Sequence, residues 1–123
     1  MTLSSGIDLI EIHRIQRSLD RYGERFLRRV FTEAEITSSR GSAPELAARF
    51  AAKEAASKAL GTGIGPISWV EVEILNERSG KPVLRLHGRA KAIAEALGYT
   101  TWSVSLTHSQ ETAAAVVVCL GQP

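Results

Sequence analysis

The chain has 123 residues, 44% of them apolar, with 15 Lys and Arg against 13 Asp and Glu and a formal net charge of +2. Its length predicts one domain covering residues 1–123, and its apolar content excludes a disordered chain. The small net charge gives no support to a nucleic-acid partner, so we expect none.

Residues 3–8 predict a short strand or an extended lead-in to a helix. In that helix an apolar stripe repeats at alternating spacings of three and four: Ile12, Ile15, Leu19, Tyr22 and Phe26. Arginines repeat at the same kind of spacing, offset by two: Arg14, Arg17, Arg21, Arg25 and Arg28. Two residues turn a helix by about 200°, so we expect the arginines to lie opposite the core. Gly23 predicts a bend or break.

This row of arginines predicts an acidic partner. A solvated helix face usually mixes both charges, whereas few acids lie among these arginines. Nucleic acid is also acidic, but no aromatic side chains interleave with the row as a stacking surface requires.

Asp8, just before the helix, has two interpretations. With Glu11 it forms a D-x-x-E pattern, which is typical of a helix N-cap. It could instead be a metal-binding carboxylate at a strand-to-helix junction. Taken alone, the pattern favours the cap.

The middle of the chain predicts two capped helices. Thr32 and Glu35 have the spacing of a capping box, and so do Ser42 and Glu45 beyond a loop at 38–45. The second helix is expected to run to about Leu60 and to end at Gly61.

From residue 47 onward the second helix is rich in alanine and carries few charges: Arg49, Lys53, Glu54 and Lys58. Glu54 and Lys58 have the favoured spacing of a surface ion pair. The alanines allow a neighbour to approach the backbone closely, and the spacing leaves open whether that neighbour is a strand or a ligand.

The remaining residues predict a glycine loop, two strands joined by a turn, a short helix and two more strands: 61–66, 67–76, 83–88, 89–98, 101–109 and 112–120. The fold class is therefore α+β, with a mainly antiparallel sheet packed against helices. The glycine loop is not a Walker loop, because no G-K-[ST] follows it. The sequence contains no pattern of a Ser/His/Asp nucleophile or a zinc site.

The single cysteine, Cys119, lies in an apolar run and is expected to be buried. It permits no internal disulfide, which is typical of a reducing compartment. No segment looks like a signal peptide, and no apolar run approaches the roughly 20 residues that span a bilayer. We therefore expect a cytoplasmic protein with no membrane partner.

Several segments, in order, resemble the short, single-domain 4'-phosphopantetheinyl transferases, the holo-acyl carrier protein synthases. They are "GIDLIEIHRI", "RFLRRVFTEAEI", "RFAAKEAASKALGTGIGPISWVEVEI", "SGKPVLRLHG" and "SVSLTHSQETAAAVVV". The resemblance covers nearly the whole chain, and "KEAASKALGTG" with the upstream "GID" is its most specific part. The chain departs at Thr107, where the family often has Ser, and matches least at 37–45.

The resemblance implies a reaction. Such enzymes transfer the phosphopantetheine arm of coenzyme A to a serine of apo-acyl carrier protein, with Mg²⁺, and release adenosine 3',5'-bisphosphate. It implies that Asp8 and Glu54 bind the metal and that Lys58 reaches the pyrophosphate. The base that takes the serine proton stays open between Glu54 and a metal-bound water.

The resemblance also implies the ligand contacts. Arg49, His108 and the turn residues Gly80, Lys81 and Pro82 would contact coenzyme A. The carrier protein would dock on the first helix through Arg14, Arg21, Arg25 and Arg28. A homotrimer with active sites between subunits is expected. The carrier, from fatty-acid or polyketide synthesis, is not specified, and a non-catalytic relative that binds coenzyme A or a carrier protein is the alternative.

Overall fold

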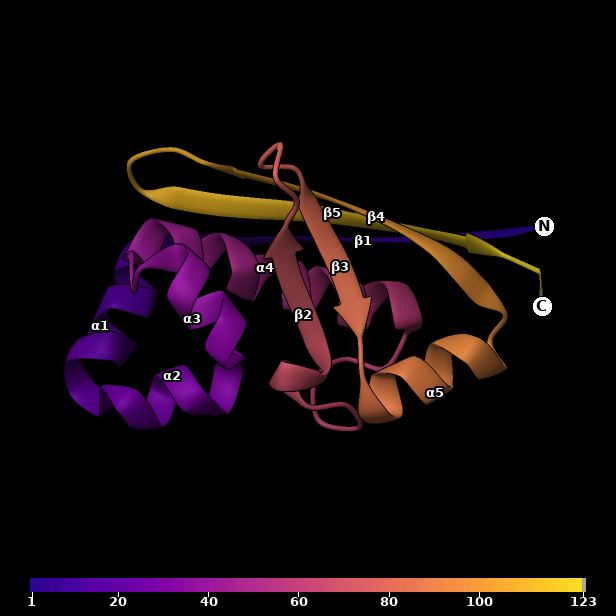
Figure 1. Ribbon diagram of the computed structural model, residues 1–123, viewed down its shortest axis with the longest axis horizontal. Coiled ribbons are helices and arrows are strands. Elements are labelled where there is room, and N and C mark those ends of the chain that lie inside the picture. The colour runs from indigo at the N-terminus through magenta and orange to yellow at the C-terminus, as the bar shows by residue number, and fades with distance from the viewer. Residues whose placement is uncertain (123) are drawn as a thin grey trace.

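A three-stranded antiparallel sheet forms one face of the computed structural model, which describes residues 1–122 (Figure 1). Its strands are β1 (Thr2–Glu11), β5 (Thr112–Gly121) and β4 (Tyr99–His108), in the order β1-β5-β4. The predicted α+β class with an antiparallel sheet is confirmed. So is the pairing of the last two strands, which follow each other along the chain.

The long helix α4 (Ala43–Leu60) lies lengthwise against the sheet and packs on β1 and β5 (Figure 1). Its alanines make this possible: Ala51, Ala52, Ala55 and Ala56 are fully buried. A side chain on Gly6 of β1 would collide with the carbonyl oxygen of Ala55. The close neighbour that the alanines admit is therefore a strand of the same chain.

Strand β1 is longer than predicted, and the difference changes the interpretation of Asp8. Asp8 lies within the strand, and the N-cap position of the next helix is Glu11, which makes no side-chain capping bond. The capping interpretation of Asp8 is therefore wrong. The strand was hard to recognise because its inward face carries Ser4, Gly6 and Asp8, whereas Ile7 and Leu9 point outward.

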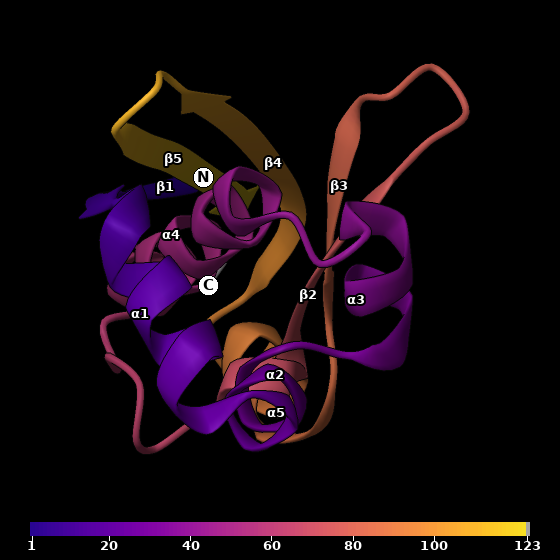
Figure 2. The ribbon, with the colours of Figure 1, turned by 90° about the vertical axis from the view of Figure 1, so that its left-hand side faces the viewer.

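Three short helices gather at one end of α4 (Figure 2). They are α1 (Ile12–Tyr22), α2 (Glu24–Val30) and α3 (Glu33–Ser39). Gly23, with a φ of 54°, breaks the predicted first helix into α1 and α2. The Thr32–Glu35 capping box is confirmed. The second box is wrong: Ser42 occupies the N-cap of α4 without a side-chain bond, and Glu45 pairs with Arg49 instead.

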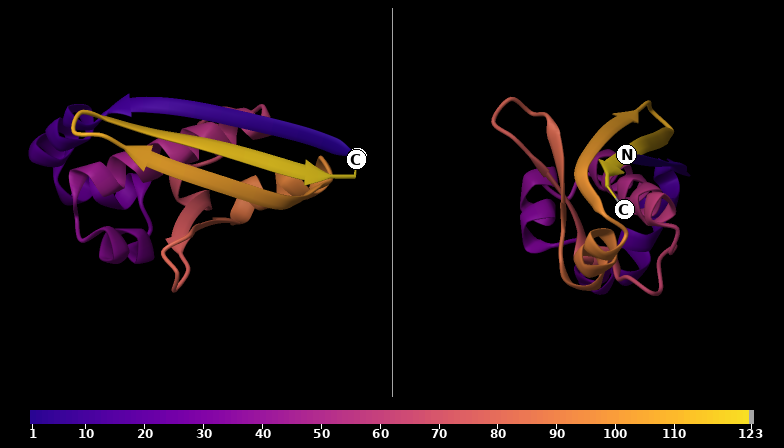
Figure 3. Two further views of the ribbon diagram at one scale, coloured as in Figure 1. Left: turned by 90° about the horizontal axis from the view of Figure 1, so that it is seen from above. Right: turned by 90° about the vertical axis from the view of Figure 1, so that its right-hand side faces the viewer.

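The strands β2 (Val72–Asn76) and β3 (Pro82–Leu86) form a separate hairpin, on the β4 side of the sheet (Figure 3). A 3₁₀ turn at Trp69–Glu71 replaces the first part of the predicted strand. Helix α5 (Gly88–Ala96) connects the hairpin to β4. Within residues 1–122, no helix is long and apolar enough to cross a membrane.

Candidate functional site

The edge strand β1 and helix α4 bring Asp8, Glu54 and Lys58 together. Lys58 Nζ lies 3.1 Å from Asp8 Oδ1 and donates to the backbone oxygen of Ile7 at 3.0 Å. Glu54 lies one helical turn before Lys58 on α4. Lys58 thus forms its ion pair with Asp8, 50 positions earlier in the chain, rather than with Glu54.

The electrostatics of this cluster favour a bound cation. Burial raises the pKa of Glu54, the negative charge of Asp8 raises it further, and Lys58 only partly offsets both. A carboxylate whose pKa is raised in this way is stabilised in its charged form when a cation binds beside it.

The donor set fits magnesium. No group of three or more His, Cys, Asp or Glu side chains within residues 1–122 is arranged to hold a metal. Mg²⁺, however, is usually held by one or two carboxylates together with substrate phosphates and waters. Asp8 and Glu54 supply two hard oxygen ligands of this kind.

A second cluster lies beyond the other edge of the sheet, in a hollow of about 680 Å³ between α4, β4 and the β2–β3 turn. It contains four residues that the sequence predicted for coenzyme A: Gly80, Lys81, Pro82 and His108. The fold therefore places the hairpin turn beside the end of β4, although Pro82 and Thr107 are 25 positions apart in the sequence.

Arg49 does not line this hollow. Its side chain is 1% exposed and pairs with Glu45, with 3.1 Å between Arg49 Nη1 and Glu45 Oε2. Lys53 is also fully buried. Of the three bases on α4, Lys58 alone is exposed in this structure.

The same hollow contains polar groups that the sequence analysis did not assign to a site. Ser103, Ser105 and Thr107 line it from β4, and Glu45 lines it from α4. The sequence of β4 could have indicated its three hydroxyl residues, because they alternate with the apolar ones and therefore share one face of the strand. Glu45 was missed because the sequence predicted that its side chain would take part in a capping box with Ser42.

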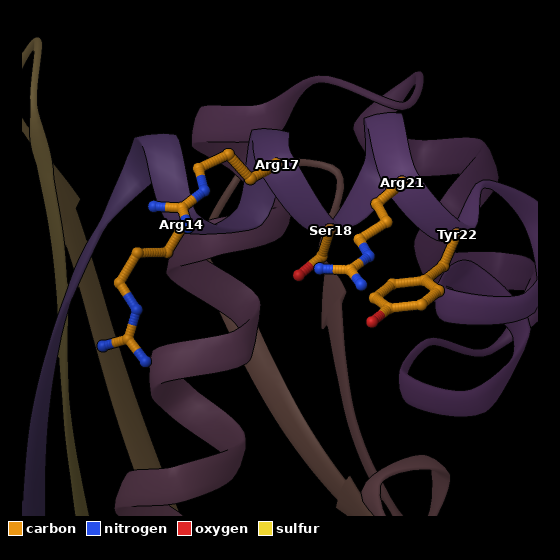
Figure 4. Close-up of a pocket in the computed structure, with 5 residues that line it drawn as sticks. All are labelled: Arg14, Arg17, Ser18, Arg21 and Tyr22. Carbon is orange, nitrogen blue, oxygen red and sulfur yellow. The ribbon is translucent and has the colours of Figure 1, made fainter.

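The arginine row is divided between two helices. Arg14, Arg17, Arg21, Ser18 and Tyr22 line a hollow of about 200 Å³ along α1 (Figure 4). Arg21 also stacks over the Tyr22 ring, with 5.4 Å from its guanidinium carbon to the ring centroid.

The next hollow, of about 370 Å³, shares Ser18 and Tyr22 and adds Arg25, Phe26 and Arg29. The two hollows form one basic surface, which we call the arginine surface: Arg14, Arg17, Arg21, Arg25 and Arg29. Arg28 differs, because it forms ion pairs with Glu24 and Glu33. Its charge is therefore already partly neutralised within the protein.

Comparison with known proteins identifies the family. Residues 4–117 match the profile of the 4'-phosphopantetheinyl transferase superfamily. The chain is 53% identical to the holo-[acyl-carrier-protein] synthase of Herpetosiphon aurantiacus, over 97% of this chain and 99% of that protein.

Two solved structures of holo-[acyl-carrier-protein] synthases share the fold. One, from Helicobacter pylori in complex with coenzyme A, is 32% identical with a TM-score of 0.87, over 94% of this chain and 99% of that one. Another, from Bacillus anthracis in complex with CoA (3',5'-ADP), is 37% identical with a TM-score of 0.79, over 97% and 96%. This chain belongs to the 4'-phosphopantetheinyl transferase superfamily, among the holo-[acyl-carrier-protein] synthases.

Proposed function

We propose that this protein transfers the 4'-phosphopantetheine arm of coenzyme A to a serine of an apo-acyl carrier protein. The serine oxygen forms a bond to the phosphorus that carries the arm, the P–O bond within the pyrophosphate breaks, and adenosine 3',5'-bisphosphate leaves. The observation that carries this proposal is the cluster of Asp8, Glu54 and Lys58. Two carboxylates beside an exposed ammonium group suit a metal and a phosphate held together.

In this proposal Asp8 and Glu54 hold Mg²⁺, and Lys58 contacts the pyrophosphate. The ion, when bound, would neutralise charge on the reacting phosphates. Lys58 is 53% exposed and is tied to Asp8 and the backbone of Ile7, so a phosphate can approach it from solvent. Its position one turn beyond Glu54 keeps both groups on one face of α4.

We further propose that Gly80, Lys81, Pro82 and His108 contact the nucleotide end of coenzyme A in the 680 Å³ hollow. Lys81 and His108 supply positive charge, and the hydroxyl groups of β4 supply hydrogen bonds for phosphates and ribose.

The two parts of the proposed site belong to opposite edges of one sheet. Asp8 lies on β1, whereas His108 lies on β4, with β5 between them (Figure 3). We propose that one subunit supplies the metal site and its neighbour supplies the nucleotide contacts, in a homotrimer. Exposed apolar side chains on the outer sheet face support such an assembly: Leu3, Ile7, Leu9 and Val116. Sedimentation equilibrium tests it, and a monomer at micromolar concentration would contradict it.

The arginine surface is proposed to dock the carrier protein, because an acidic partner complements it. We place the protein in the cytoplasm, a proposal supported by its one free and buried cysteine, Cys119.

The deciding experiment is mass spectrometry of an apo-acyl carrier protein incubated with this protein, coenzyme A and Mg²⁺. The expected result is the added mass of one phosphopantetheine arm, together with release of adenosine 3',5'-bisphosphate. The absence of added mass on fatty-acid and polyketide carriers alike would contradict the transferase, and binding of coenzyme A without transfer would favour a non-catalytic relative.

A further inference from the structure

Glu45 places a negative charge in a hollow proposed to receive phosphates. The other ionisable side chains that line this hollow are Lys81 and His108, and the rest of the lining is neutral. The Glu45 side chain is 47% exposed, so it is accessible to a ligand.

The structure shows Glu45 in contact with two bases. Its Oε2 lies 3.1 Å from Arg49 Nη1, and its Oε1 lies 3.7 Å from His108 Nε2, within ion-pair distance when the imidazole is protonated. Arg49 Nη1 also donates to the backbone oxygen of Glu45 at 3.2 Å. One carboxylate therefore spans a guanidinium and an imidazole, as a phosphate group would.

Arg49 depends on this carboxylate. Its side chain is 1% exposed, and the other side chain that its guanidinium contacts is the neutral Ser38 hydroxyl, 3.3 Å from Nη2. The Nε atom is buried without a hydrogen-bond partner. A buried positive charge with one acidic partner becomes costly when that partner is removed, unless another anion takes its place.

We propose that Glu45 is an internal competitor of the coenzyme A phosphates and thereby sets the affinity of the hollow for the nucleotide. In the free protein its carboxylate neutralises Arg49 and lies against His108. A bound phosphate must either share these two bases with the Glu45 carboxylate or displace the carboxylate from them. This inference rests on the proposed function, because it takes coenzyme A as the ligand of the hollow.

The test is Glu45→Gln, with the Kd of adenosine 3',5'-bisphosphate measured by calorimetry. We expect the Kd to fall about tenfold, the change that about 1.4 kcal/mol produces. The midpoint of thermal unfolding should fall in the free variant, and the bisphosphate should raise it more than in the unaltered protein. Glu95→Gln, an exposed residue on α5, is the matched control and should change neither quantity.

A double variant identifies the base involved. In Glu45→Gln/Arg49→Gln the gain in affinity should disappear, because the released charge is absent. Glu45→Asp keeps a charge but reaches less far, so it should give a smaller gain and provides the test should Glu45→Gln fail to fold. An unchanged or higher Kd in these single variants overturns the inference. If the unaltered protein neither binds the bisphosphate nor modifies a carrier, the proposed function fails as well.

Discussion

Lys53 and Glu35 form an ion pair that is completely enclosed by the protein. Lys53 Nζ lies 2.8 Å from Glu35 Oε1, and both side chains have 0% exposure. Lys53 also donates to the backbone oxygens of Trp69 and Val72, and Glu35 accepts from the backbone nitrogens of Thr32 and Ile74. The pair thus ties α3, α4 and β2 together through bonds that satisfy every donor of the ammonium group.

Replacement of Lys53 by Met should destabilise the protein strongly. It leaves the Glu35 carboxylate buried without its cation, a situation that costs about 3–5 kcal/mol. Urea unfolding at neutral pH measures this loss. The control Lys91→Met, on the exposed face of α5, should change the free energy of unfolding by less than about 0.5 kcal/mol. A loss as small as that of the control would show that the pair is not essential to the fold.

Glu54→Gln should remove transfer activity. It takes away one of the two carboxylates proposed to hold Mg²⁺, so we expect a rate at least about 100-fold lower at saturating coenzyme A. The rate of carrier modification at a series of Mg²⁺ concentrations gives the answer, and the circular dichroism spectrum should be unchanged. Full activity in this variant would remove Glu54 from the metal site.

The stability of the metal-free protein should depend on the ionisation of Glu54. Because the pKa of Glu54 is raised in the folded state, the folded protein holds this proton more tightly than the unfolded chain does. Stability from this group is present below its ordinary pKa of about 4.5 and is lost as the pH rises through the higher folded pKa.

Glu54→Gln should therefore be more stable than the unaltered protein at pH 7, and the difference should shrink toward pH 4. Since the side chain is partly solvated, we expect less than about 1 kcal/mol. Thermal unfolding of both proteins in EDTA, from pH 4 to pH 7, measures this difference in stability. A difference that grows as the pH falls would contradict the sign.

Arg21→Glu should weaken carrier binding more than coenzyme A binding. Arg21 belongs to the arginine surface, and the residues that line its hollow are all different from those that line the 680 Å³ hollow. Reversal of a charge opposite an acidic partner should raise the KM for the carrier about 10-fold or more and reduce its dependence on salt. Steady-state kinetics with each substrate varied in turn separates the two effects. Lys91→Glu on α5 is the matched control, and equal losses for both substrates would argue against docking at this surface.

Short-range patterns were enough to predict much of this protein. The Thr32–Glu35 capping box, the end of α4 at Gly61 and the break at Gly23 were all confirmed. Each depends on residues within about four positions, where helix geometry and glycine conformation act directly. The order of motifs also predicted the family, which the comparisons confirmed.

Contacts between distant residues were decided by the tertiary structure. The sequence favoured a cap for Asp8 and a surface pair for Glu54 and Lys58, but strand β1 continues through Asp8 and brings it to Lys58. Strand pairing and the packing of α4 on Gly6 set that contact, and they involve residues about 50 to 120 positions apart. The same packing buried Arg49 and Lys53. The sequence did not predict this burial, because charge alone does not tell which face of an alanine-rich helix meets the sheet.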